Sequence, residues 1–137
     1  MLSNFNNRYL HYQYFESEKT LLQQWHYTGQ KNQLHLLRYF NEIIDLQQVY
    51  DIKHLVLDFQ RFTCHLPISA QRRLKKDFVI RLAEIGITSI TIVKSQNTET
   101  QTHLEDIFSG NLPVSIKFLN SPNVKGILDE GEVMMSV

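Results

Sequence analysis

The stretch His54-Leu55-Val56-Leu57-Asp58-Phe59 lies near the middle of the chain and decides the fold class. It is apolar almost throughout, yet it is too short for a buried helix and has the usual length of a strand. A run of this kind, without polar alternation, is typical of a central strand covered on both faces. The segments around it should therefore supply the helices of an α/β domain.

The segments on both sides of this strand have the periodicity of amphipathic helices. One helix is predicted over residues 31–50 and another over residues 69–85, and Gly86 stands where a left-handed C-terminal cap is expected. The apolar positions are Leu34, Leu36, Leu37, Phe40, Ile43 and Ile44 in the first helix and Leu74, Phe78, Leu82 and Ile85 in the second.

Two aromatic-rich segments near the N-terminus indicate strands. Residues 9–16 and 20–28 are rich in β-forming side chains, and only the polar turn Ser17-Glu18-Lys19 separates them. Strands joined by so short a turn must pair antiparallel. The chain is therefore predicted to open with a β-hairpin.

Strands and helices alternate after the second long helix. The pattern predicts a β-branched strand over residues 87–94, a helix over 100–109, a strand over 114–119 and a short final helix starting at Ser121-Pro122. The order is β-β-α-β-α-β-α-β-α, and its later strands require right-handed parallel crossovers. The predicted fold is one α/β domain over residues 1–137, with a mixed, mostly parallel sheet of four to five strands.

Composition excludes several classes of protein. The 137 residues are 42% apolar and 20% charged, which is typical of a globular domain. The 14 basic and 14 acidic residues leave no net charge, so we expect no nucleic-acid partner. No secretory signal and no apolar run of about 20 residues occurs, so we expect no membrane insertion and a cytoplasmic location. The single cysteine rules out a disulfide within the chain.

Three stretches carry a family resemblance: YQYFESEKTLLQQWHYTG (12–29), KHLVLDFQRF (53–62) and ISAQRRLKKDFVIRLAEIGITSITIVKS (68–95). Through them the chain resembles the STAS-like (SpoIIAA-like) superfamily, named for sulfate transporters and anti-sigma-factor antagonists. It looks most like the small, uncharacterised bacterial branch of that superfamily, and the resemblance covers about residues 9–130. The resemblance implies a four- or five-stranded mixed sheet with helices mainly on one side.

The resemblance also directs attention to Ser69. In anti-sigma-factor antagonists, a serine at the start of the corresponding helix is phosphorylated within an Asp-Ser-Ser-Gly-like turn. Here the loop reads RFTCHLPIS (61–69) and lacks that turn, although Ser69 lies near the same place. Ser69 is either a phosphate acceptor or an ordinary helix cap.

Basic side chains make the helix over residues 69–85 a candidate interaction or anion site. Such a cluster could bind an acidic partner or a phosphorylated ligand, or it could simply be a solvated face. The candidate residues are Ser69, Arg72, Arg73, Lys76 and Asp58, with Lys75 and Arg81 in the same basic cluster. Asp58 ends the central strand, where open α/β sheets bind ligands, but it could equally cap the loop that follows.

Cys64 and His65 also follow the central strand. A thiolate beside an imidazole would be nucleophilic, but neighbouring side chains usually point apart and no third orienting group is evident. Metal-ligand spacings such as C-x-x-C and H-x-x-x-H are missing, as are glycine-rich phosphate loops. We therefore expect no catalytic residues, metal site or cofactor.

The hairpin carries an unusual number of aromatic residues. Tyr12, Tyr14, Trp25 and Tyr27 are the candidate self-association surface, because Tyr and Trp are frequent at interfaces. The alternative is that these rings pair across the strands and fill the core.

These observations favour a non-enzymatic protein-interaction or regulatory module of the STAS-like type, with an unknown protein partner and a possible homodimer. The alternative is a binder or carrier of a small apolar or lipid-like ligand. That function would require a cavity of about 300–1,000 Å³ beneath the helices. An enzyme would require Cys64, His65 and Asp58 to meet within hydrogen-bonding distance.

Overall fold

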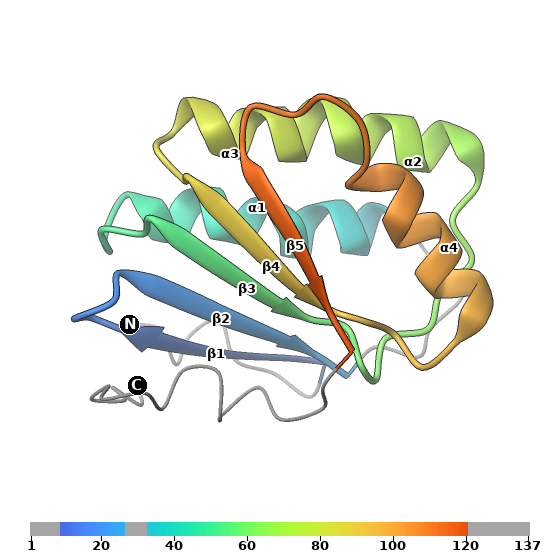
Figure 1. Ribbon diagram of the computed structural model, residues 1–137, viewed down its shortest axis with the longest axis horizontal. Helices are drawn as coiled ribbons and strands as arrows, with labels where there is room; N and C mark the ends of the chain where they lie inside the picture. The colour runs from blue at the N-terminus through green and yellow to red at the C-terminus, as the bar shows by residue number, and fades with distance from the viewer. Residues whose placement is uncertain (1–8, 27–32, 121–137) are drawn as a thin grey trace.

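The computed structural model describes residues 9–26 and 33–120, and in the first helix it describes side chains from Leu37 onward. Within these residues, five strands form one sheet in the order β1-β2-β3-β4-β5 (Figure 1). The strands are β1 (Leu10–Phe15), β2 (Thr20–Trp25), β3 (His54–Asp58), β4 (Ser89–Val93) and β5 (Ser115–Leu119). The α/β class predicted from the sequence is confirmed.

Strand pairing follows the predicted pattern. β1 and β2 are antiparallel, with Tyr14 opposite Leu21, and every later pair is parallel. The register continues from Leu21 to Leu55 on β3 and from there to Ile90 on β4. β3 is buried at four of its five positions, as expected for a strand covered on both faces.

Three helical regions connect the parallel strands: α1 (Gln33–Gln47), the continuous segment made of α2 (Ile68–Leu74), η2 (Lys75–Val79) and α3 (Ile80–Glu84), and α4 (Thr98–Ile107). The predicted helix at Ser121 lies outside the described residues. None of the described helices combines the length and apolarity needed to cross a membrane.

The described helices all cover the same face of the sheet. Right-handed crossovers that always step to the next strand in one direction place every helix on one side. A single core cluster accordingly joins Phe40 of α1, Phe78 of η2 and Leu104 of α4 to alternate sheet residues such as Leu55 and Ile90. The opposite face has a smaller cluster of buried residues, all of them from strands: Phe15, Leu22, Val56 and Val93.

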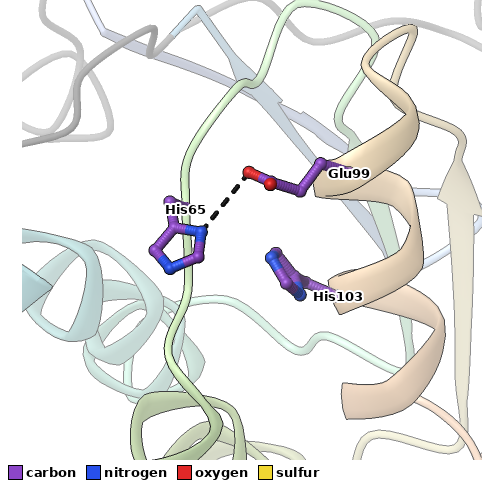
Figure 2. A group of neighbouring side chains, drawn as sticks. All are labelled: His65, Glu99 and His103. Atoms are coloured by element: carbon purple, nitrogen blue, oxygen red, sulfur yellow. Dashed lines mark hydrogen bonds and ion pairs between the residues drawn. The ribbon is translucent and has the colours of Figure 1, made fainter.

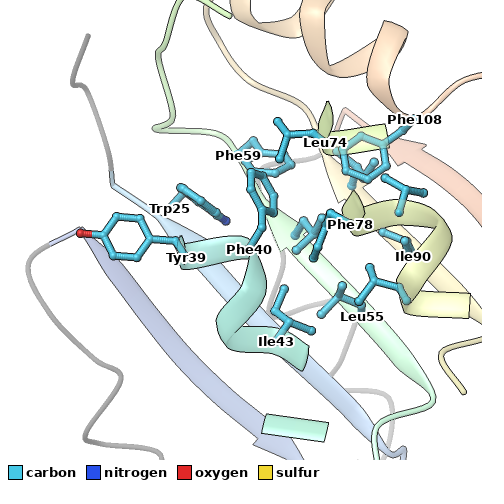
Figure 3. Packing of buried hydrophobic residues seen from close by; sticks show 14 of the residues in the cluster. Trp25, Tyr39, Phe40, Ile43, Leu55, Phe59, Leu74, Phe78, Ile90 and Phe108 are labelled. Carbon is cyan, nitrogen blue, oxygen red and sulfur yellow. The ribbon is translucent and has the colours of Figure 1, made fainter. Parts of the chain in front are cut away.

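Aromatic rings fill the core between the hairpin, α1 and η2 (Figure 3). The centroid of the Trp25 ring lies 4.8 Å from that of Phe40 and 5.1 Å from that of Phe62. Phe40 in turn lies 4.6 Å from Phe78. These tilted and edge contacts are geometries that aromatic pairs prefer.

The burial of the hairpin aromatics bears on the predicted self-association surface. Tyr12, Tyr14 and Trp25 are only 2%, 6% and 1% exposed to solvent, and they belong to the core cluster beneath the helices. Tyr27 lies outside the described residues. The three described rings therefore pack in the core, as in the alternative considered for them.

A buried glutamine explains how the polar tips of these aromatic residues are accommodated. Gln23 is fully buried, and its Nε2 donates to the Tyr12 hydroxyl at 2.9 Å and to the Tyr39 carbonyl at 3.2 Å. Its Oε1 accepts from Trp25 Nε1 at 2.8 Å. Because buried polar groups are costly when unpaired, this network ties the hairpin to α1 in one arrangement.

Candidate functional site

The loop between β3 and α2 is fastened to the start of α4. The Cys64 amide donates to Thr100 Oγ1 at 3.1 Å, and the Thr100 hydroxyl donates to the Cys64 carbonyl at 3.2 Å. The Ser95 hydroxyl donates to the Phe62 carbonyl at 2.8 Å. The loop buries the side chains of Phe62 and Leu66. The side chain of His65, which lies between them in the sequence, is exposed beside α4.

The start of α4 presents two ligand-type side chains on the same side. Asn97 caps this helix, because its Oδ1 accepts from the Thr100 amide at 2.9 Å. Glu99 and His103 follow four residues apart, a spacing that makes helical side chains neighbours.

His65, Glu99 and His103 converge at this point (Figure 2). His65 Nδ1 lies 3.3 Å from Glu99 Oε1, and the rings of His65 and His103 meet edge to face with centroids 5.5 Å apart. One nitrogen or oxygen atom from each residue lies within 4.8 Å of those from the other two. The side chains of His65 and Glu99 are each 64% exposed, so the cluster opens to solvent.

Gln71 of α2 contacts the cluster through His103. Its Nε2 donates to the Leu66 carbonyl at 2.7 Å and lies 2.9 Å from His103 Nδ1. The other ring nitrogen of His103, Nε2, is buried and has no hydrogen-bond partner. Such an unpaired buried group is uncommon in folded proteins and calls for an explanation.

A surface cleft of about 250 Å³ lies next to the cluster and shares Gln71 with it. Its lining combines an apolar side chain, Ile68, with the cations Arg72 and Lys75 and the carboxylate of Asp106. Ile68 is 64% exposed, a high value for a large apolar residue.

The structure brings together most of the predicted anion site. Ser69, Arg72, Arg73 and Lys76 all lie on the continuous helix from α2 to α3, and all are exposed. Pro67 is the N-cap residue of α2, so the interpretation of Ser69 as an ordinary cap is wrong. Ser69 is the second residue of the helix.

Asp58 lies apart from this group. Its side chain is on the face of the sheet opposite the described helices, where it accepts from Gln24 Nε2 at 3.3 Å and from the Gln60 amide at 3.0 Å. The bond to the Gln60 amide is the loop-capping role considered as the alternative for Asp58. The anion site and Asp58 are therefore separate features.

Cys64 does not form a nucleophilic centre with its neighbours. The side chain is buried, and burial raises the pKa of the Cys64 thiol to about 11. Its Sγ lies 3.6 Å from the carbonyl oxygen of His65, whereas the imidazole of His65 is directed to Glu99. A thiol in this setting is protonated at neutral pH and lacks the base that would activate it.

Glu99 and His103 were not among the residues predicted from sequence. The i, i+4 spacing of a carboxylate and a histidine is a weak signal for a ligand pair, and it identifies its partner His65 only after the loop is placed on α4.

Comparison of the chain with family models, with curated proteins and with solved structures finds no match.

Proposed function

We propose that this chain is a SpoIIAA-like interaction module that binds an acidic segment of a protein partner along α2 and η2. The sheet order and the one-sided helices agree with the topology implied by the STAS-like resemblance. Because a fold alone does not define a function, the proposal depends on the surface that the helix presents.

The observation that carries the proposal is the cleft in which exposed Ile68 lies beside Arg72 and Lys75. Residues 72–81 contain five cations but only one acid, Asp77, in a chain without net charge. Asp77 pairs with Arg73 at 3.8 Å, and no other cation of this segment has an acidic partner within the described residues. An apolar side chain flanked by such cations suits a peptide that combines carboxylates with an apolar anchor.

The alternative of an apolar-ligand carrier has less support. The cleft is a surface feature lined by two cations, a carboxylate and an amide, which is a poor lining for a lipid-like molecule. Beneath the helices, close contacts among Trp25, Phe40, Phe62 and Phe78 occupy the core.

The test measures binding of the full chain to synthetic peptides of one length that carry a single leucine among acidic, neutral or basic residues. We expect the acidic set to bind best, and more weakly as salt rises. Arg72→Glu should weaken that binding at least about tenfold, which corresponds to ~1.4 kcal/mol. Fluorescence anisotropy would measure both effects.

The matched control is Lys117→Glu, which makes the same change of charge at an exposed residue of β5. Its neighbours Ile116 and Phe118 pack against the core, so Lys117 lies on the face of the sheet opposite the described helices. This variant should bind the acidic peptides like the wild-type chain. Equal losses in both variants, or no preference for acidic over neutral peptides, would contradict the proposal.

A further inference from the structure

We propose that His65, Glu99 and His103 form a binding site for a divalent transition metal of the zinc class. Two imidazoles and a carboxylate are a ligand set that zinc uses in proteins when a fourth position is left open. None of the site's three residues lines the cleft of the proposed peptide surface, although Gln71 contacts His103 and also lines that cleft. The three site residues come from the loop after β3 and from α4 (Figure 2).

The distances fit such an ion. With metal–ligand bonds of about 2.0–2.1 Å in tetrahedral geometry, two ligand atoms lie about 3.3 Å apart. His65 Nδ1 and Glu99 Oε1 already have this separation of 3.3 Å. All three ligand atoms lie within 4.8 Å of one another. Small side-chain rotations are therefore enough to bring them to the spacing that one metal ion requires.

The unpaired nitrogen of His103 is the second observation that points to a ligand. Gln71 Nε2 donates one hydrogen bond to the Leu66 carbonyl, and this bond shows which end of the Gln71 amide is the nitrogen. Because the same nitrogen lies next to His103 Nδ1, it donates its second hydrogen bond there and Nδ1 is the acceptor. The proton of the neutral ring then lies on Nε2, which is buried without an acceptor. A metal bound at Nε2 would give this atom the partner that it lacks.

Binding at this nitrogen changes the tautomer of the ring. The neutral imidazole keeps its single proton, which moves from Nε2 to Nδ1 when the metal takes the Nε2 lone pair. The Gln71 amide then has to give up its bond to the Leu66 carbonyl and rotate, so that its oxygen accepts from Nδ1 as the outer partner of a ligating histidine. The exposure of His65 and Glu99 leaves the fourth metal position to water or to a donor from outside the chain.

The experiment titrates the chelator-treated full chain with ZnCl₂ by calorimetry and with CoCl₂ by visible absorption. We expect one equivalent to bind, with excess Mg²⁺ unable to compete because it prefers an all-oxygen shell. Long-range ¹H–¹⁵N spectra of the histidine rings should shift at His103 Nε2 and at His65.

Two variants test the assignment without disturbing the core. His65→Ala and Glu99→Gln alter side chains that are both 64% exposed, so their melting temperatures without metal should equal that of the wild-type chain. Each should weaken Zn²⁺ binding at least tenfold. His54→Ala is the matched control, because it removes an exposed imidazole that contacts Ser89 instead.

Two results would overturn the site. One is a wild-type chain that binds no Zn²⁺ in the calorimeter. The other is Zn²⁺ binding that is as tight in His65→Ala and in Glu99→Gln as in the wild-type chain and in His54→Ala. Neither result affects the peptide measurements at Arg72, so the two proposals can fail separately.

Discussion

Glu42 on α1 shows how the fold changes the chemistry of one residue. Its Oε1 accepts a 2.6 Å hydrogen bond from the Tyr12 hydroxyl, at the outer end of the network around Gln23. Burial raises the pKa of Glu42, and the bond from Tyr12 and the charge of Arg38 oppose this only in part. The folded chain therefore holds a proton on Glu42 more tightly than the unfolded chain does.

A pH dependence of stability follows from this difference. Because the folded pKa is the higher one, the stabilisation from protonated Glu42 is complete below the unfolded value, about 4.3 for glutamate, and is lost as pH rises through the folded value. We expect Glu42→Gln, which keeps an acceptor for Tyr12 but cannot ionise, to remove this loss.

Urea unfolding over a pH series would measure the effect as the wild-type free energy of unfolding minus that of the variant. The difference should fall as pH rises toward neutrality. Glu84→Gln, the same change at an exposed acid of α3, is the control for a general change of charge. A Glu42→Gln difference that stays flat, or rises with pH, would show that burial does not govern this carboxyl.

Gln47 connects three elements. It is the last residue of α1, and its Nε2 donates to the Ile52 carbonyl at 2.8 Å and to the Ile85 carbonyl at 3.0 Å. Its Oε1 accepts from the Ile52 amide at 2.8 Å. One side chain therefore joins the end of α1, the approach to β3 and the end of α3, where Gly86 turns the chain with a φ of 103°.

We expect Gln47→Ala to destabilise the fold by about 1–3 kcal/mol, because it leaves partly buried backbone groups without partners. Denaturant unfolding compared with Gln48→Ala would measure this loss. Gln48 is the exposed neighbour of Gln47, so its truncation controls for the change in composition. Equal stabilities of the two variants would mean that solvent replaces the three bonds without loss.

At the scale of the whole molecule, stability should be highest at the centre of the sheet. β3 and β4 each pair with a strand on both sides, whereas β5 pairs only with β4 among the described residues and has no fully buried side chain. The ring contacts between α1 and η2 also lie above the central strands.

Native-state hydrogen exchange should reproduce this gradient. The amides of Leu55, Leu57, Ile90 and Ile92 should exchange only through global unfolding, whereas those of β5 should exchange faster through local opening. Exchange followed residue by residue by NMR would test this. Protection in β5 equal to that in β3 would instead indicate that the sheet opens as one unit.

The sequence alone was sufficient for the order of the described elements and for the antiparallel or parallel direction of their strands. The run at residues 54–59, the helical stripes and the short turn at 17–19 are local patterns, and each reports how its own segment folds. Element ends were less accurate: the strand predicted over 87–94 is Ser89–Val93, and the helix predicted over 100–109 is Thr98–Ile107. Asn97 caps that helix earlier than the apolar pattern indicated.

Only the tertiary structure decided which side chains meet. Trp25 and Tyr12 could have faced solvent or the core, and the helices above them determined that they are buried. His65 and Glu99 are 34 positions apart, and they become neighbours because the Cys64–Thr100 bonds seat one loop on one helix. Hydrophobic periodicity is a property of a single segment, whereas a ligand set depends on how two segments pack, and no local pattern carries that information.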